Sequence, residues 1–191
     1  MKHLQARALF ALAVLLPSIA RAQANPTATR QLQLSAFAGG TGTFTDLFGG
    51  KNLGITAGAD LTLLRYRLLR PSIEVRGTYP IHEGKIDSQK SILAGAKVEH
   101  SFGPFRPYVD FLVGRGEINY LLGGYYLSTS NTLYIRSTST VYSPGIGIDY
   151  DLTRRLAVKA DLQVQRWNTP VLPSGTIHPR ALTIAAVYRF R

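Results

Sequence analysis

The stretch that decides the fold is Leu53-Gly54-Ile55-Thr56-Ala57-Gly58-Ala59-Asp60-Leu61-Thr62-Leu63. Apolar side chains occupy every odd position, and glycine, threonine or aspartate occupies every even one. An alternation with a period of two places the two sets on opposite faces of a β-strand, whereas a helix would mix them. We therefore predict a strand over 53–63 with one apolar and one polar face.

Seven further stretches carry the same alternation, and glycine, proline, asparagine and aspartate mark the breaks between them. Their predicted ranges are 31–38, 72–79, 91–99, 108–117, 141–150, 156–165 and 182–190. The connections between them alternate in length. Short ones are predicted at 65–70, 101–105 and 151–155, and long ones at 43–52, 80–89, 118–140 and 167–179. Short turns on one rim and long loops on the other are typical of a membrane barrel. The fold class that follows is all-β: a closed, antiparallel, eight-stranded, up-and-down transmembrane β-barrel.

The N-terminus predicts export. Lys2, His3 and Arg7 precede an apolar run over 8–16, and Ala20-Arg21-Ala22 follows it. This order is that of a secretory signal peptide, and the apolar run is too short for the roughly 20 residues of a spanning helix. We expect residues 1–22 to be cleaved, with Ala24 as the second candidate position, and residues 23–191 to form one barrel domain. Cysteine is absent, so disulfides contribute no stability.

The alternation alone does not say whether the apolar face points inward, as in a soluble barrel, or outward to lipid. The polar face carries charges of both signs, each about four to seven residues into its strand from the nearest short turn: Asp60, Glu74, Arg76, Lys97, Glu99, Asp110, Lys159 and Asp161. In a narrow lumen these charges should pair in one layer, because an unpaired buried charge is strongly disfavoured. The alternative is a set of solvated charges on a soluble barrel.

Glycine collects on the polar face toward the long loops, for example at Gly54, Gly114, Gly116 and Gly145. Two interpretations stay open. The small side chains could leave a shallow water-filled vestibule, or they could serve only to let the strands bend.

The aromatic residues suggest the two membrane interfaces and one contact surface. Tyr79 falls near the long-loop rim, and Tyr150, Tyr188 and Phe190 fall near the short-turn rim, as expected for interfacial girdles. Within the longest loop, Tyr120, Tyr125, Tyr126 and Tyr134 lie among serine, threonine and asparagine. This composition is that of an adaptable contact surface, although a loop folded over the barrel mouth fits it too.

The charge balance favours anionic partners. The chain has 22 basic and 11 acidic residues, and loss of Lys2, Arg7 and Arg21 leaves a mature charge of about +8. Lipopolysaccharide and the lipid bilayer are therefore the expected partners. Nucleic acid is not expected, because the protein is exported and no compact basic run with interleaved aromatics is present.

The final strand, Leu182-Thr183-Ile184-Ala185-Ala186-Val187-Tyr188-Arg189-Phe190, and the hairpin formed by 144–150 and 156–161 resemble the small outer-membrane barrels of the OmpA and OmpX type. The resemblance covers nearly all of the mature chain. It implies residence in the outer membrane and insertion by the outer-membrane assembly machinery, which reads a final strand ending in an aromatic residue. Tyr188 and Phe190 supply that signal, although Arg191 follows Phe190 and departs from the pattern.

Catalytic and metal sites are not indicated. His100-Ser101 lies beside a short turn rather than along one face of the barrel. His82, Glu83 and Asp87 are more readily explained as solvated polar residues of a loop than as a cation site. We expect no cofactor, no turnover and a monomer. The expected function is a structural or surface-interaction role in the outer membrane. The alternatives are a narrow pore for small solutes and a soluble, periplasmic, lipocalin-like barrel that binds a small apolar ligand.

Overall fold

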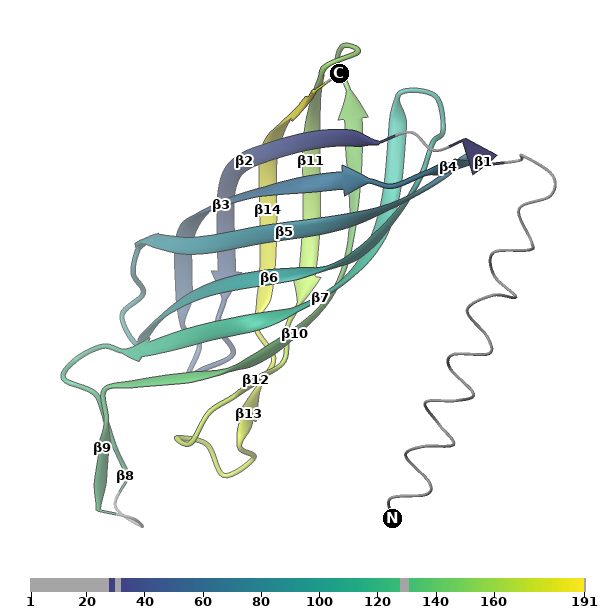
Figure 1. The fold of residues 1–191 in the computed structure, drawn as a ribbon. Helices are drawn as coiled ribbons and strands as arrows, with labels where there is room; N and C mark the ends of the chain where they lie inside the picture. Colours follow the sequence, from purple (N-terminus) through teal and green to yellow (C-terminus); the bar gives the residue numbers. More distant parts are fainter. Residues whose placement is uncertain (1–27, 30–31, 128–130, 191) are drawn as a thin grey trace, which may run out of the picture.

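The chain forms one closed antiparallel barrel of eight strands (Figure 1). The computed structural model describes residues 28–29, 32–127 and 131–190. The signal peptide predicted at 1–22 and its cleavage site therefore lie outside the described residues. The barrel strands are β2 (Gln33–Phe44), β3 (Lys51–Thr62), β5 (Leu69–His82), β6 (Asp87–His100), β7 (Phe105–Tyr120), β10 (Arg136–Asp151), β11 (Leu156–Val164) and β14 (Arg180–Arg189).

Each barrel strand pairs with its neighbours in the chain, and the last strand returns to the first. The β14–β2 ladder runs from Arg180 opposite Phe44 to Arg189 opposite Ser35, and this pairing closes the barrel. The predicted fold class is confirmed. Closure removes the sheet edges, so the barrel can satisfy its backbone hydrogen bonds without water.

The predicted strand positions are correct, but several strands are longer than predicted. β7 and β10 each extend to 16 residues, so the loop predicted over 118–140 is shortened at both ends. The rest of that loop contains a small hairpin of β8 (Tyr125–Leu127) and β9 (Thr132–Tyr134). Side-chain alternation weakens where a strand leaves the membrane, although the backbone pairing continues.

Besides β8 and β9, four more short strands lie outside the barrel wall. β12 (Trp167–Asn168) pairs with β13 (Thr176–Ile177) inside the last long loop. At the short-turn rim, β4 (Arg65–Tyr66) pairs with β1 (Ala28–Thr29). In Figure 1 the β8–β9 hairpin projects beyond one end of the barrel, and the short turns lie at the other end with the C-terminus.

The orientation of the side chains is that of a membrane barrel. On β14, Leu182, Ile184 and Tyr188 are exposed on the outside, whereas Thr183 and Arg189 are buried inside. A soluble barrel has the reverse arrangement, so the soluble lipocalin-like alternative is wrong. In the part of the chain that the structure describes, no helix is long and apolar enough to cross a membrane.

Aromatic side chains mark both rims of the outer wall. Phe105 packs against Tyr150 with tilted rings whose centroids are 5.1 Å apart, and Tyr188 meets Phe190 edge-on at 5.0 Å. These four lie near the short turns. Tyr79 is exposed on the opposite side of the apolar band. The wall therefore carries aromatic side chains at both levels where a bilayer has its interfaces.

Candidate functional site

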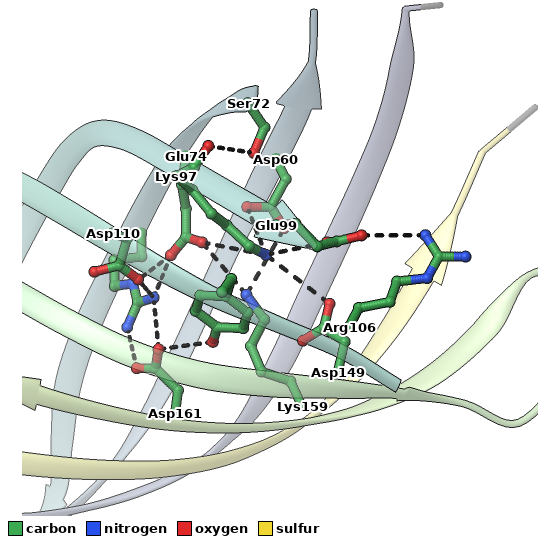
Figure 2. Close-up of polar contacts among 12 residues, drawn as sticks. Asp60, Ser72, Glu74, Lys97, Glu99, Arg106, Asp110, Asp149, Lys159 and Asp161 are labelled. Atoms are coloured by element: carbon green, nitrogen blue, oxygen red, sulfur yellow. Dashed lines mark hydrogen bonds and ion pairs between the residues drawn. The ribbon is translucent and has the colours of Figure 1, made fainter. Parts of the chain in front are cut away.

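The half of the lumen nearer the short turns is filled by a network of ion pairs (Figure 2). The ammonium groups of Lys97 and Lys159 point into the same space from opposite sides of the barrel. Lys97 Nζ lies 3.6 Å from Asp60 and 3.9 Å from Glu74, and Lys159 Nζ lies 3.7 Å from Asp60 and 3.3 Å from Glu74. Two lysines thus share two carboxylates across the lumen.

Arg76 makes the second centre of the network. Its guanidinium pairs with Glu74, lies 2.5 Å from Asp161 through Nη1, and lies 3.5 Å from Asp110 through Nη2. Glu99 extends the network toward the short-turn rim, where it meets Arg106 at 3.2 Å. All eight residues of the predicted charge layer therefore lie inside the barrel, and each contacts at least one other member.

The strand register explains why these residues meet. Lys97 on β6 is directly opposite Asp110 on β7, and Asp60 on β3 is directly opposite Glu74 on β5. Inward side chains at one level of a narrow barrel must contact one another, because the interior of eight strands is only wide enough for side chains. Ion pairs in such an interior are weakly screened, so removal of one partner costs more than at a surface.

Several members of the network were not predicted from the sequence. Asp149 lies 3.9 Å from Lys97 and 3.6 Å from Arg189. Gln163 donates to Asp110 at 3.0 Å, and the Tyr108 hydroxyl donates to Asp161 at 2.7 Å. All four carry the inward parity of their strands, which was the available signal. They were left out because an amide, a phenol or a charge near a strand end does not by itself indicate a buried layer of ion pairs.

Two aromatic rings inside the lumen complete the surroundings of the lysines. Lys159 Nζ lies 3.9 Å from the ring centroid of Phe37 and 5.0 Å from that of Tyr108. Lys97 Nζ lies 4.1 Å from the Tyr108 ring. A cation over an aromatic face is attracted by the ring quadrupole, so these rings stabilise the buried ammonium groups while excluding water.

The half of the lumen nearer the long loops is closed by an apolar plug. We use this name for the buried cluster of Leu47, Leu93, Leu112, Ile118, Tyr120, Val141, Trp167, Val171 and Ile177. Part of it comes from barrel strands and part from the loop that holds β12 and β13. Trp167 is 1% exposed, and its indole N–H donates to Gln165 at 2.8 Å. The last long loop therefore folds into the barrel mouth.

Of the two interpretations of the lumen glycines, the water-filled vestibule is wrong. A Cβ added to Gly116 would lie 2.2 Å from the Trp167 ring, and one added to Gly147 would lie 2.3 Å from the Tyr108 ring. These glycines make room for large side chains that reach them from other strands. The lumen is filled at the level where the sequence suggested that side-chain volume falls.

Enlarging Gly116 is expected to displace the plug. In Gly116→Val the new side chain competes with Trp167, so the loop should leave the barrel mouth at a cost of about 1–3 kcal/mol. Because Trp167 is the only tryptophan, its fluorescence reports this change directly as a red shift. Gly40→Val is the matched control, since nothing lies within 4 Å of a Cβ added to Gly40. Unchanged emission in Gly116→Val would contradict the packing described above.

The four tyrosines of the longest loop do not form one surface. Tyr120 is buried in the plug, where its hydroxyl bonds to Thr169 at 2.7 Å and to Ser137 at 2.8 Å. Tyr134 packs against the plug, and Tyr125 stacks on Phe48 at 5.7 Å. Tyr126 alone of the four is strongly exposed. Tyr120 must therefore be removed from the predicted contact surface.

The hairpin presents apolar side chains in their place. Leu122 is 91% exposed, and Leu133 and Ile135 are each more than half exposed. Leu133 belongs to β9 of the hairpin that projects beyond the barrel end, and Leu122 and Ile135 flank the hairpin in the chain (Figure 1). An apolar surface that is held away from the bilayer is a candidate contact site for another molecule.

A cleft of about 490 Å³ lies between the first two long loops at the same end. Lys51, His82, Glu83 and Lys85 contribute to its lining. Asp87 does not join them, because it is buried and accepts hydrogen bonds from Thr45 at 2.7 Å and Gln89 at 2.9 Å. Among the described residues, no group of three or more His, Cys, Asp or Glu side chains could hold a metal ion. The lining of the cleft therefore carries two lysines against one carboxylate.

Comparison with known proteins identifies the fold. No protein-family model and no curated protein matches the chain. Neisserial surface protein A (NspA) aligns over 85% of this chain and 97% of its own at 16% identity, with a TM-score of 0.54. Ail, the attachment invasion locus protein of Yersinia pestis, aligns over 83% and 97% at 11% identity, with a TM-score of 0.53. The fold is that of an eight-stranded outer-membrane barrel. OprG from Pseudomonas aeruginosa aligns over 87% of this chain and all of its own at 11% identity, with a TM-score of 0.51.

These identities establish shared architecture, and the OmpA and OmpX type of barrel expected from the sequence fits it. They do not transfer a function, because one barrel fold carries many unrelated activities.

Proposed function

We propose that the protein is a non-catalytic barrel of the outer membrane that acts through its long-loop end as a surface-interaction protein. The observation that carries the proposal is the filling of the lumen. The ion-pair network occupies the half nearer the short turns, and the apolar plug occupies the half nearer the long loops. Because the described residues fill the lumen, we expect the protein to bind other molecules on its outer surface.

The long-loop end has features suited to binding anionic groups. Lys51 lines the loop cleft from the start of β3, and His82 and Lys85 line it from the segment that follows β5, while Glu83 is the single acid in that lining. Ammonium groups bind sulfate and phosphate as point charges. An anionic polysaccharide, such as the carbohydrate of lipopolysaccharide or a sulfated glycan, is the partner class we propose.

The distribution of histidines supports a role without turnover. His100 lies at the short-turn rim, His82 ends β5, and His178 lies in the last long loop. Nucleophilic catalysis needs a base within hydrogen-bond reach of the nucleophile. The aromatic end of the last strand, Tyr188 and Phe190, is proposed as the signal for the assembly machinery, because both rings are exposed on the wall.

Sucrose octasulfate is the probe for the first test, since one structure of Ail contains this heparin analogue. The folded protein in detergent is titrated calorimetrically. The double variant Lys51→Ala and Lys85→Ala is expected to weaken binding about tenfold, because it removes both cations of the cleft.

Arg154→Ala with Arg155→Ala is the matched control. It removes the same charge from the short-turn rim, where both arginines are exposed, and should leave binding unchanged. Equal losses in the two double variants would mean that net charge alone attracts the probe. The proposal would then be abandoned.

The filled lumen also predicts that the protein does not conduct ions. In planar bilayers the protein should give no discrete conductance steps at high protein loading. Regular steps would favour the narrow-pore alternative over a surface role.

A further inference from the structure

The barrel wall is interrupted between β5 and β6 at its outward end. The β5–β6 ladder runs from Leu69 opposite His100 to Thr78 opposite Ser91. β5 continues to His82 and β6 already begins at Asp87, but no pairing joins these two strands beyond Thr78 and Ser91 in residues 28–29, 32–127 and 131–190. Figure 1 shows the two strand ends apart, connected by their loop.

The sequence gives a reason for the interruption at this position. Pro80 follows two residues after the last pair and has no backbone N–H to donate to a ladder. On its other side β5 remains paired to β3, with a register shift between Leu53 and Gly54. The wall therefore stays intact on one side of β5 and opens on the other.

A groove of about 560 Å³ lies on the outer wall at this interruption. Its floor includes Ala57 and Gly77, and its apolar sides include Ile55, Tyr79 and Ile92. Gly77 keeps the floor low, since a Cβ added there would meet only the Ser91 carbonyl oxygen at 3.8 Å. The groove is therefore an open space on the lipid-facing surface, and apolar side chains border it on both sides.

Charged side chains line one end of the groove. Lys90, Arg115 and Glu117 belong to its lining. Lys90 Nζ lies 3.1 Å from Glu117, and Arg136, just outside the groove, lies 3.8 Å from the same carboxylate. Arg115 is exposed and forms no ion pair within the described part of the chain. The three cations exceed the single acid, so this end attracts an anion.

The depth of these charges matches a lipid headgroup. On β7 the outward positions from Phe105 to Val113 are apolar, and Arg115 is the next outward residue. The distance from Phe105 to Arg115 is that of a transmembrane strand of about 9–11 residues. Unpaired backbone groups at the interruption are tolerated at this level, where headgroups can bond to them, but would be costly in the hydrocarbon.

We propose that this groove is a binding site for the lipid A part of lipopolysaccharide, with one acyl chain against Gly77 and a phosphate at Arg115 and Lys90. The long loops mark this end as the outward one, and lipid A is the phosphorylated lipid of the outer leaflet. The site lies on the wall rather than in the loop cleft, so it is independent of the surface-binding role proposed above.

The test measures lipid retention by native mass spectrometry of the folded protein in detergent. The probes are diphosphoryl lipid A, lipid A stripped of phosphate, and phosphatidylglycerol. Arg115→Gln is expected to lower retention of diphosphoryl lipid A about tenfold, to the level of the stripped form. Gly77→Leu fills the floor and should lower retention of both forms of lipid A.

Two control variants accompany these. Gly40→Leu adds the same side chain to another exposed position of the wall, and Arg154→Gln removes a charge from the opposite rim. Both should retain lipid A as the unmodified protein does. Heat-modifiable gel mobility checks that each barrel is folded, and the exposed Arg115→Gln keeps the test informative if Gly77→Leu does not fold.

Two results would overturn the proposal. One is equal retention of lipid A by all variants. The other is retention of phosphatidylglycerol as strong as that of lipid A, which would assign the groove to anionic lipids in general. Sucrose octasulfate binding should be unchanged in Arg115→Gln, so failure here is distinguishable from failure of the loop cleft.

Discussion

Replacing Arg76 by alanine is expected to lower the free energy of unfolding by about 3–5 kcal/mol. Arg76 is 4% exposed and is shared by Glu74, Asp110 and Asp161. Its removal leaves these carboxylates close together in a narrow lumen, and only Lys97 and Lys159 remain nearby to pair with Glu74. The cost comes mainly from the buried charges left without a partner rather than from the lost attraction itself.

Urea unfolding of the protein in lipid vesicles, followed by gel mobility, measures the effect. Arg154→Ala is the control, because Arg154 is exposed in a short turn and its loss should change stability by less than about 0.5 kcal/mol. The difference between the two variants should persist at high salt, since buried pairs are weakly screened. Equal destabilisation by both substitutions would refute the assignment of Arg76 to the lumen.

Replacing Trp167 by alanine should have a comparable effect at the other end of the lumen. The indole fills the space over Gly116 and packs within the apolar plug. Removing a buried aromatic side chain of this size costs about 3–5 kcal/mol through lost transfer energy and the cavity that remains. The loop of β12 and β13 should also become accessible to protease, because Trp167 anchors it in the barrel mouth.

The fluorescence probe is lost in this variant, so circular dichroism and gel mobility report its unfolding. Leu122→Ala is the control, since Leu122 is a loop residue that is almost fully exposed. It should alter neither stability nor protease resistance by much. Stability of Trp167→Ala close to that of the unmodified protein would mean that the plug does not support the barrel.

Much of this architecture follows from local sequence. The alternation around Leu53–Leu63 and its counterparts predicts the strands, because side-chain direction in a strand depends only on position parity. The same parity places Lys97, Lys159 and Asp161 on the inward face. The short turns and long loops then predict an up-and-down barrel with its long loops at one end.

Position parity along a strand was not enough to predict which side chains meet in the lumen. Arg76 and Asp161 are 85 positions apart and meet only because each strand is held in register by its neighbours. The glycines were misjudged for the same reason. A sequence shows that Gly116 has no side chain, but it does not show that Trp167 from a distant loop occupies the space.

The sequence by itself determined the strands, the division of each strand into an apolar and a polar face, and the charges on the polar face, since all three depend on a period of two along single strands. Only the structure showed that the polar face points inward. The tertiary structure alone decided which charges pair, how the last long loop closes the mouth, and where the β5–β6 ladder stops. Those features depend on registers and contacts between strands and loops that are far apart in the chain.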